Sequence, residues 1–169
     1  EPPPESGLRR KFPPPFAPGE VKGAGWVFCT HHHLDHLDPG TLGPLAAASP
    51  EARFVVPSPH VALAREAGVP AGRIVAARAG QPIEAGGFRV HPLPSAHEAL
   101  ETDPQGDHLY LGYLFDFGGV RLYHAGDTVD YPGLAEALAG WRPHVVCLPI
   151  NGRDRRRREQ GIIGNLNYR

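Results

Sequence analysis

Short apolar runs recur along the chain, and most of them are bounded by glycine, proline or polar residues. Their length and their content of valine, isoleucine and aromatic residues are typical of buried strands rather than helices. We expect strands over residues 26–29, 54–56, 73–76, 88–93, 109–117, 120–123 and 145–148. The first and the last of these are expected to lie in the core.

Two dipeptides carry a helix-start signal. Asp38-Pro39 and Ser58-Pro59 each combine an N-cap residue with proline at the first helical position, where its missing N–H costs nothing. They predict helices that end near residues 48 and 68, and a third helix is expected over roughly 131–139. Strands outnumber helices, and the two alternate only in the first third of the chain. This pattern favours an α/β (α+β) fold in which a mixed sheet packs against helices.

Glycine pairs mark two tight turns, at Gly86-Gly87 and Gly118-Gly119. The second pair is expected to join strands 109–117 and 120–123 as a hairpin. Residues 1–20 hold Pro-Pro-Pro twice, which predicts an extended arm or a plain linker, and residues 21–169 form one domain. The chain has no methionine and begins inside this proline-rich stretch, so we interpret it as an internal piece of a longer protein, with a processed mature chain as the alternative.

Composition excludes some classes of function. The 169 residues are 41% hydrophobic with a formal net charge of −1, so no overall charge favours nucleic acid or an anionic membrane. No apolar run is long enough for a membrane span. Cys29 and Cys147 each lie in an apolar run and are expected to be buried free thiols. Two cysteines make no disulfide framework, which favours a cytoplasmic location.

Candidate chemistry gathers directly after the first strand, in Thr30-His31-His32-His33-Leu34-Asp35-His36. His31 and His33 are two residues apart and project to the same side in extended geometry. Asp35 and His36 follow and can face a second point nearby. Imidazole and carboxylate groups are ligands for zinc and neighbouring metals. A solvated histidine patch or an expression tag is disfavoured, because the cluster follows an apolar strand and includes a carboxylate.

The motif His31-x-His33-x-Asp35-His36 resembles the signature of the metallo-β-lactamase superfamily. The resemblance implies an αββα sandwich with a two-metal site at the sheet edge, and therefore two divalent ions, Zn or Mn. It also implies a third histidine and a bridging aspartate, which match His97 and Asp127, each directly after an expected strand. One metal would then be held by His31, His33 and His97. Asp35 and His36 would hold the other, with Asp127 shared.

Within that superfamily the chain is similar to the ascorbate-6-phosphate lactonase-like (UlaG-like) group. Four stretches carry this likeness: residues 30–41, 123–128, 148–154 and 161–168. Relative to the family, the opening strands and the final histidine ligand are missing, so the sandwich is expected to be incomplete at both ends and the fragment to be poorly active.

The resemblance implies hydrolysis of a lactone, or of a phosphorylated sugar lactone, by a hydroxide that two metals activate. Asp35 would orient that hydroxide and pass a proton to the leaving group. Arg153 would meet a phosphate, and Asn151 a substrate oxygen. If the run Arg153–Arg158 binds no phosphate, it is expected to be a solvated loop. Nucleic acid is not favoured as its partner. A small-molecule substrate is therefore expected.

Other functions stay open. A thioester hydrolase of the glyoxalase II type and a superfamily nuclease share the same metal-binding core. An alternative from another class of function is that the chain is an incomplete, non-catalytic metal-binding domain. Oligomeric state is not predicted by any pattern in the sequence.

Overall fold

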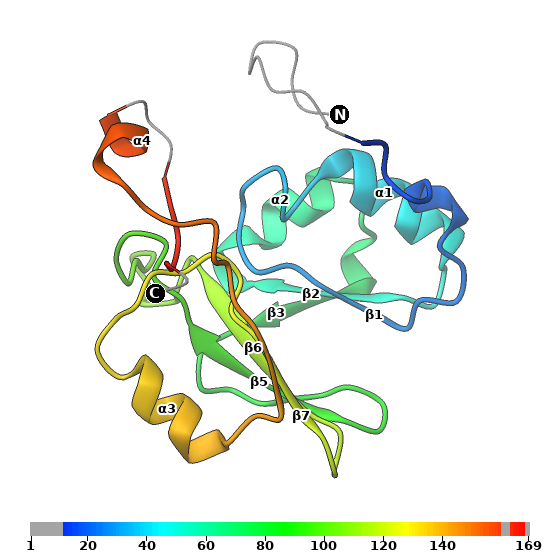
Figure 1. The fold of residues 1–169 in the computed structure, drawn as a ribbon. Coiled ribbons are helices and arrows are strands. Elements are labelled where there is room, and N and C mark those ends of the chain that lie inside the picture. The colour runs from blue at the N-terminus through cyan, green and yellow to red at the C-terminus, as the bar shows by residue number, and fades with distance from the viewer. Residues whose placement is uncertain (1–11, 160–162, 168–169) are drawn as a thin grey trace.

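The computed structural model describes residues 12–159 and 163–167, and within them two β-sheets face each other with helices on their outer sides (Figure 1). The first sheet is parallel and has the order β1 (Trp26–Phe28), β2 (Arg53–Pro57), β3 (Ile74–Ala77). The second sheet has the order β4 (Ile83–Glu84), β5 (Arg89–Pro94), β6 (Leu111–Asp116), β7 (Arg121–His124), β8 (Val145–Cys147). Its strands pair antiparallel, except for the parallel pair β7–β8.

The described helices are α1 (Pro39–Ala48), α2 (Val61–Glu66), α3 (Leu134–Trp141) and the short α4 (Arg155–Glu159). Helix α1 begins as predicted, because the side chain of Asp38 accepts a hydrogen bond from Gly40 N at 3.0 Å. The second predicted start is wrong in detail. Ser58 opens a 3₁₀ turn, η3 (Ser58–His60), and α2 follows without a side-chain cap.

Strand β2 shows how the layers are held. Its residues alternate between two apolar clusters, because side chains along a strand point to opposite faces. Phe54 and Val56 pack with α1 and α2, whereas Val55 packs between the sheets with Leu111 and Tyr113. A third cluster joins the second sheet to α3 through the residues Leu114, Tyr123 and Leu134. The layers therefore run helix, sheet, sheet, helix, and the predicted αββα sandwich is confirmed.

The two glycine turns form where they were expected. Gly86 and Gly87 have φ values of +60° and +113°, and Gly118 has +81°, a backbone conformation that other residues rarely adopt. The first turn joins β4 to β5 and the second joins β6 to β7. Residues 109–110, which were expected to belong to a strand, precede β6 and lie in the loop beside the candidate site.

The prediction that strand β8 lies in the core is wrong. Its three residues are exposed, and Val145 and Val146 are 46% and 43% accessible. Because β8 lies at the edge of its sheet, its one strand neighbour there is β7. For the same reason Cys147 is an exposed thiol, and the expectation that it is buried is wrong. Cys29 is buried, as predicted.

The two thiols are expected to differ in reactivity. Burial raises the pKa of Cys29 to about 11, so at pH 8 only about one molecule in a thousand carries the reactive thiolate. A thiol reagent should label Cys147 in the native chain and leave Cys29 unmodified until the protein unfolds. Mass spectrometry of the labelled peptides checks this. Equal labelling of both cysteines under native conditions would contradict the buried position of Cys29.

The proline-rich arm is only partly within the described residues, since residues 1–11 lie outside them. Residues 18–20 form a 3₁₀ turn, η2 (Pro18–Glu20), that packs against α1. The chain that follows η2 is held by Ser49, at the end of α1, because the Ser49 hydroxyl donates to Val21 O and accepts from Ala24 N. Among the described residues, no helix has the length and apolar character that a membrane span requires.

Candidate metal centre

Three loops meet at one edge of the sandwich, and each leaves the carboxyl end of a strand. They follow β1, β5 and β7 and hold residues 29–37, 95–97 and 125–128. Strands β5 and β7 are both antiparallel to β6, so they run in the same direction and end at the same edge. Leu111 N, at the start of β6, donates to Thr30 O at 2.9 Å and ties the loop after β1 to that edge.

Hydrogen bonds fix the second and third loops against each other. The hydroxyl of Ser95 donates to Ala125 O at 2.7 Å, and Ala96 N donates to Thr128 Oγ1 at 3.1 Å. Val129 N completes the contact by donating to Ala96 O at 2.7 Å. These bonds hold the two residues before His97 against the residues that precede and follow Asp127 in the sequence.

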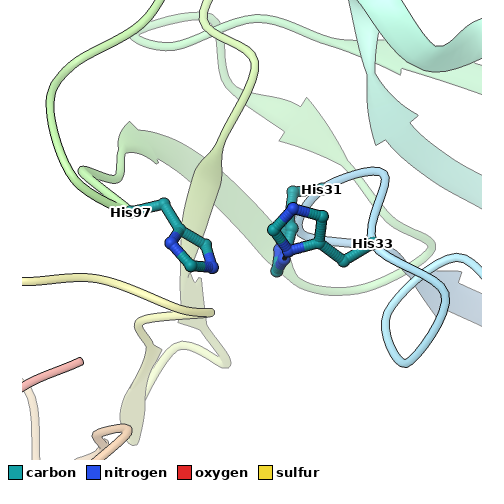
Figure 2. A group of neighbouring side chains, drawn as sticks. All are labelled: His31, His33 and His97. Atoms are coloured by element: carbon teal, nitrogen blue, oxygen red, sulfur yellow. Dashed lines mark hydrogen bonds between the residues drawn. The ribbon is translucent and has the colours of Figure 1, made fainter. Parts of the chain in front are cut away.

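Three histidines converge in the space between the loops. One nitrogen from each of His31, His33 and His97 lies within 4.8 Å of the others, and Figure 2 shows the His97 ring facing the other two. His31 is completely buried and His97 is 4% accessible. The predicted convergence is confirmed. Its cause differs from the extended geometry we expected, because residues 31–37 fold into bends and turns, with Leu37 N donating to His33 O.

A second group adjoins the first. Ligand atoms of His31, His36 and Asp127 also lie within 4.8 Å of one another. Asp127 faces both groups, because its Oδ1 is 3.4 Å from His36 Nε2 and its Oδ2 is 3.6 Å from His97 Nε2. The carboxylate therefore lies between the two groups, where the sequence resemblance led us to expect a bridging residue.

Asp35 lies at the rim of the site. Its carboxylate is 80% accessible, and its Oδ2 is 3.6 Å from His36 Nε2. The resemblance implied that Asp35 and His36 share a metal. Among the described residues, however, the second compact group contains His31 in addition to His36 and Asp127, and Asp35 stands outside it.

The protonation states of the cluster suit a cation. Burial, with the neighbouring rings of His36 and His33, lowers the pKa of His31 to about 2. Burial and the ring of His97 likewise lower the pKa of His33. Both imidazoles are therefore neutral near pH 7, with lone pairs free to bind a metal.

The Asp127 carboxylate supplies negative charge. Burial alone would raise the pKa of Asp127, but hydrogen bonds from His36, His97 and Asn165 outweigh it and hold that pKa well below its usual range. The same contact acts on its partner. Burial alone would lower the pKa of His36, whereas the hydrogen bond and the charge of Asp127 raise it above its ordinary value. Without a metal, the carboxylate and this imidazole stabilise each other.

Two residues that support the cluster were missed in the sequence. The hydroxyl of Thr30 lies 3.0 Å from Nδ1 of both His31 and His36, and so fixes the orientation of two rings. The ring of Tyr110 packs against the rings of His31 and His97, with centroids 5.2 and 5.4 Å away. Thr30 could have been found from the sequence, since it directly precedes the histidine motif. No sequence pattern connects Tyr110 to that motif.

Gly126 allows the third loop to approach the first. Its φ is +62°, and a Cβ on it would lie only 2.8 Å from the Cβ of Thr30. A larger residue would therefore push away the hydroxyl that orients two of the histidines. This contact explains why a glycine precedes Asp127.

Of the two predicted substrate residues, Arg153 lies beside the metal-binding groups, because it forms a close ion pair with Glu98, the residue after His97. The side chain of Asn151 is exposed, and its backbone oxygen accepts a hydrogen bond from Arg157. The run that was interpreted as a loop contains the short helix α4. The residues around α4 line an open pocket of about 610 Å³: Arg153, Asp154, Arg155, Arg158 and Glu159.

Comparison with known proteins agrees with this architecture. The family model described as the beta-lactamase superfamily domain matches residues 4–166. The chain belongs to the beta-lactamase superfamily. Its relatives in that superfamily include UPF0173 metal-dependent hydrolases of Aeropyrum pernix, 32% identical over 151 residues, and of Methanoregula boonei, 31% identical over 156 residues.

This chain aligns with only part of the length of these relatives. The alignments cover 82% and 88% of this chain but 59% and 65% of the Aeropyrum and Methanoregula proteins. Solved structures of the same fold include the metallo-beta-lactamase fold protein YhfI from Bacillus subtilis, with a TM-score of 0.58 at 15% identity. That match covers 85% of this chain and 55% of YhfI, and at this identity it supports the fold alone.

Proposed function

We propose that this chain forms the metal-binding core of a metal-dependent hydrolase that uses two divalent ions, Zn or Mn. The observation that carries the proposal is the position of Asp127, whose two oxygens face His36 and His97, one from each ligand group. A carboxylate between two clusters of imidazoles suits a pair of divalent ions. The name of the UPF0173 relatives, metal-dependent hydrolase, supports the same function.

The geometry supports the ligand roles we propose. His31, His33 and His97 would hold one ion, and His36 with Asp127, which lie close to His31, the other. Two ions held in this way would supply a nucleophile from water near neutral pH and would stabilise negative charge on the reacting group. Asp35, exposed at the rim and close to His36, would complete the second ligand set and hold or pass the proton of the leaving group.

For the substrate, we propose a small lactone, and a phosphorylated sugar lactone as the preferred form, as in the UlaG-like group. Positive charge beside the site supports this class. Arg155 and Arg158 line the pocket near Glu98 with side chains that are 91% and 58% accessible. Guanidinium groups match phosphate oxygens. Asn151 and Arg153 would contact substrate at the edge of this pocket.

Both thiols are free, which supports a cytoplasmic location.

The test is turnover by the intact protein, loaded with Zn or Mn, on a panel of substrates. The panel holds a lactone, its phosphorylated form, an acyl thioester and a nucleic acid. We expect the phosphorylated lactone to react fastest, a chelator to stop turnover, and added metal to restore it. Preference for the thioester or the nucleic acid would replace the lactonase proposal with one of those activities. Turnover that is insensitive to the chelator would overturn the metal-dependent hydrolase itself.

Thr30→Val tests the support of the histidines. Valine keeps the shape of threonine but removes the hydroxyl that bonds to Nδ1 of His31 and His36. We expect metal affinity to fall by roughly 10- to 100-fold, the usual effect of losing a group that orients a ligand. Competition with a coloured chelator measures the affinity, and Thr30→Ser, which keeps the hydroxyl, serves as the control. Equal affinity in all three proteins would remove Thr30 from the account.

A further inference from the structure

The stretch of chain after β8 returns to the edge of the sandwich where the metal centre lies (Figure 1). Two of its parts run side by side. Gly152 N donates to Leu166 O, and Arg153 N donates to the side chain of Asn167, each at 3.1 Å. Gly164 makes the approach possible, since a Cβ on it would lie 2.7 Å from the Cα of Arg153. Residues 151–153 and 163–167 therefore form one packed unit, which we call the return segment.

The return segment contacts the loop that carries His97 through the ion pair between Arg153 and Glu98, two residues that are 55 positions apart in sequence. Glu98 directly follows His97, one of the predicted ligands. Asn165, in the same segment, is 3% accessible, so this part of the segment is buried.

The Arg153–Glu98 pair supplies an anchor that His97 otherwise lacks on one side. Before His97, Ser95 and Ala96 are bonded to the loop after β7. After it, none of the backbone hydrogen bonds found among the described residues involves residues 97–100. The first fixed group on that side is the Glu98 carboxylate. It is 33% accessible and Arg153 is 24% accessible, so the pair is partly shielded, and Arg158 Nη2 lies 4.0 Å from the same Glu98 oxygen.

We propose that the return segment positions the metal centre, with Arg153 holding Glu98 beside His97. This inference rests on the proposed function and deepens it. Arg153 is a positioning residue in this role, since it acts through His97. The role adds to the substrate contact proposed for Arg153, because its Nη2 pairs with Glu98 while its Nη1 is buried without a hydrogen-bond partner among the described residues.

The experiment measures the affinity of the metal-free intact protein for Zn, by competition with a coloured chelator, in Arg153→Met. The substitution keeps approximate size and removes the ion pair with Glu98. We expect the variant to bind Zn about tenfold more weakly, as for other groups that orient ligands. Arg89→Met is the matched control. Arg89 is 56% accessible and pairs with Glu84 at the start of β5, the end away from the metal centre, so its loss should leave the affinity unchanged.

A double-mutant cycle separates positioning from general stability. If Arg153 acts through Glu98, then Arg153→Met added to Glu98→Gln should cause no further loss of affinity, and Arg153→Lys should restore part of it. Thermal unfolding of the metal-free variants should give midpoints close to that of the parent. Unchanged Zn affinity, additive losses in the cycle, or a loss matched by unfolding of the metal-free protein would each overturn the inference.

The same measurements keep this inference apart from the proposed function. If the parent protein binds no Zn, the metal-dependent hydrolase proposal fails, and the inference fails with it. If the parent binds two ions and Arg153→Met binds them equally well, only the positioning role of the return segment is lost.

Discussion

Asp127→Asn is expected to reduce the metal content of the intact protein from two ions to one. The two oxygens of Asp127 face His36 and His97, so this carboxylate contacts a histidine of each ligand cluster. Asparagine keeps the shape but removes the negative charge that balances the second cation. Turnover of a lactone should fall by at least about 100-fold, since stabilisation of the developing charge depends on the full site. Metal analysis after dialysis measures the stoichiometry.

Asp130→Asn is the matched control, because Asp130 lies three residues further on and is exposed. It should keep two ions and full turnover. Asp127→Ala should behave like Asp127→Asn, with a larger loss because the hydrogen bond from Asn165 also disappears. An Asp127→Asn protein that still binds two ions as tightly as the parent would sink the bridging role of this residue.

His33→Ala should have an effect of similar size on the other ion. His33 Nδ1 lies 3.0 Å from His31 Nε2, and both converge with His97. Removing one of three imidazoles leaves that ion with two histidines and the shared Asp127, and we expect its affinity to fall by roughly 100-fold or more. Because His33 is only half-buried, the fold should survive the change. Isothermal titration of the metal-free protein measures the loss.

His32→Ala is a sharp control for His33→Ala, because the two residues are adjacent. The His32 ring packs on His60 and Tyr110, with centroids 4.9 and 5.8 Å away, and it belongs to neither of the ligand groups found among the described residues. Its removal should leave both binding sites at nearly full affinity. If His32→Ala weakens the metal as much as His33→Ala, the assignment of ligands within the motif is wrong.

Local signals in the sequence predicted much of this fold. The cap at Asp38 and the glycine turns depend on neighbouring residues only, and each lies where it was expected. The convergence of His31, His33 and His97 was also predictable, because functional loops follow strand ends and strands that run in the same direction end together. The resemblance to a known family added Asp127, which no local pattern singles out.

Features that depend on distant packing were not predictable. The apolar run 145–148 has the composition of a core strand, yet its exposure is decided by what covers the sheet edge. The place of Asp35 outside the compact groups depends on how one turn folds. The pairing of Arg153 with Glu98 joins residues 55 positions apart, and no periodicity connects them. In each case the sequence gives the chemistry of a side chain but not its neighbour.

The number of metal ions bound per chain tests the central claim most directly. The intact protein should be freed of metal, saturated with Zn or Mn, dialysed and analysed for metal and protein in the same sample. The account predicts two ions per chain, one held by His31, His33 and His97 and one by His36 and Asp127. A protein that retains no ion, or at most one under saturating metal, would contradict a two-metal hydrolase.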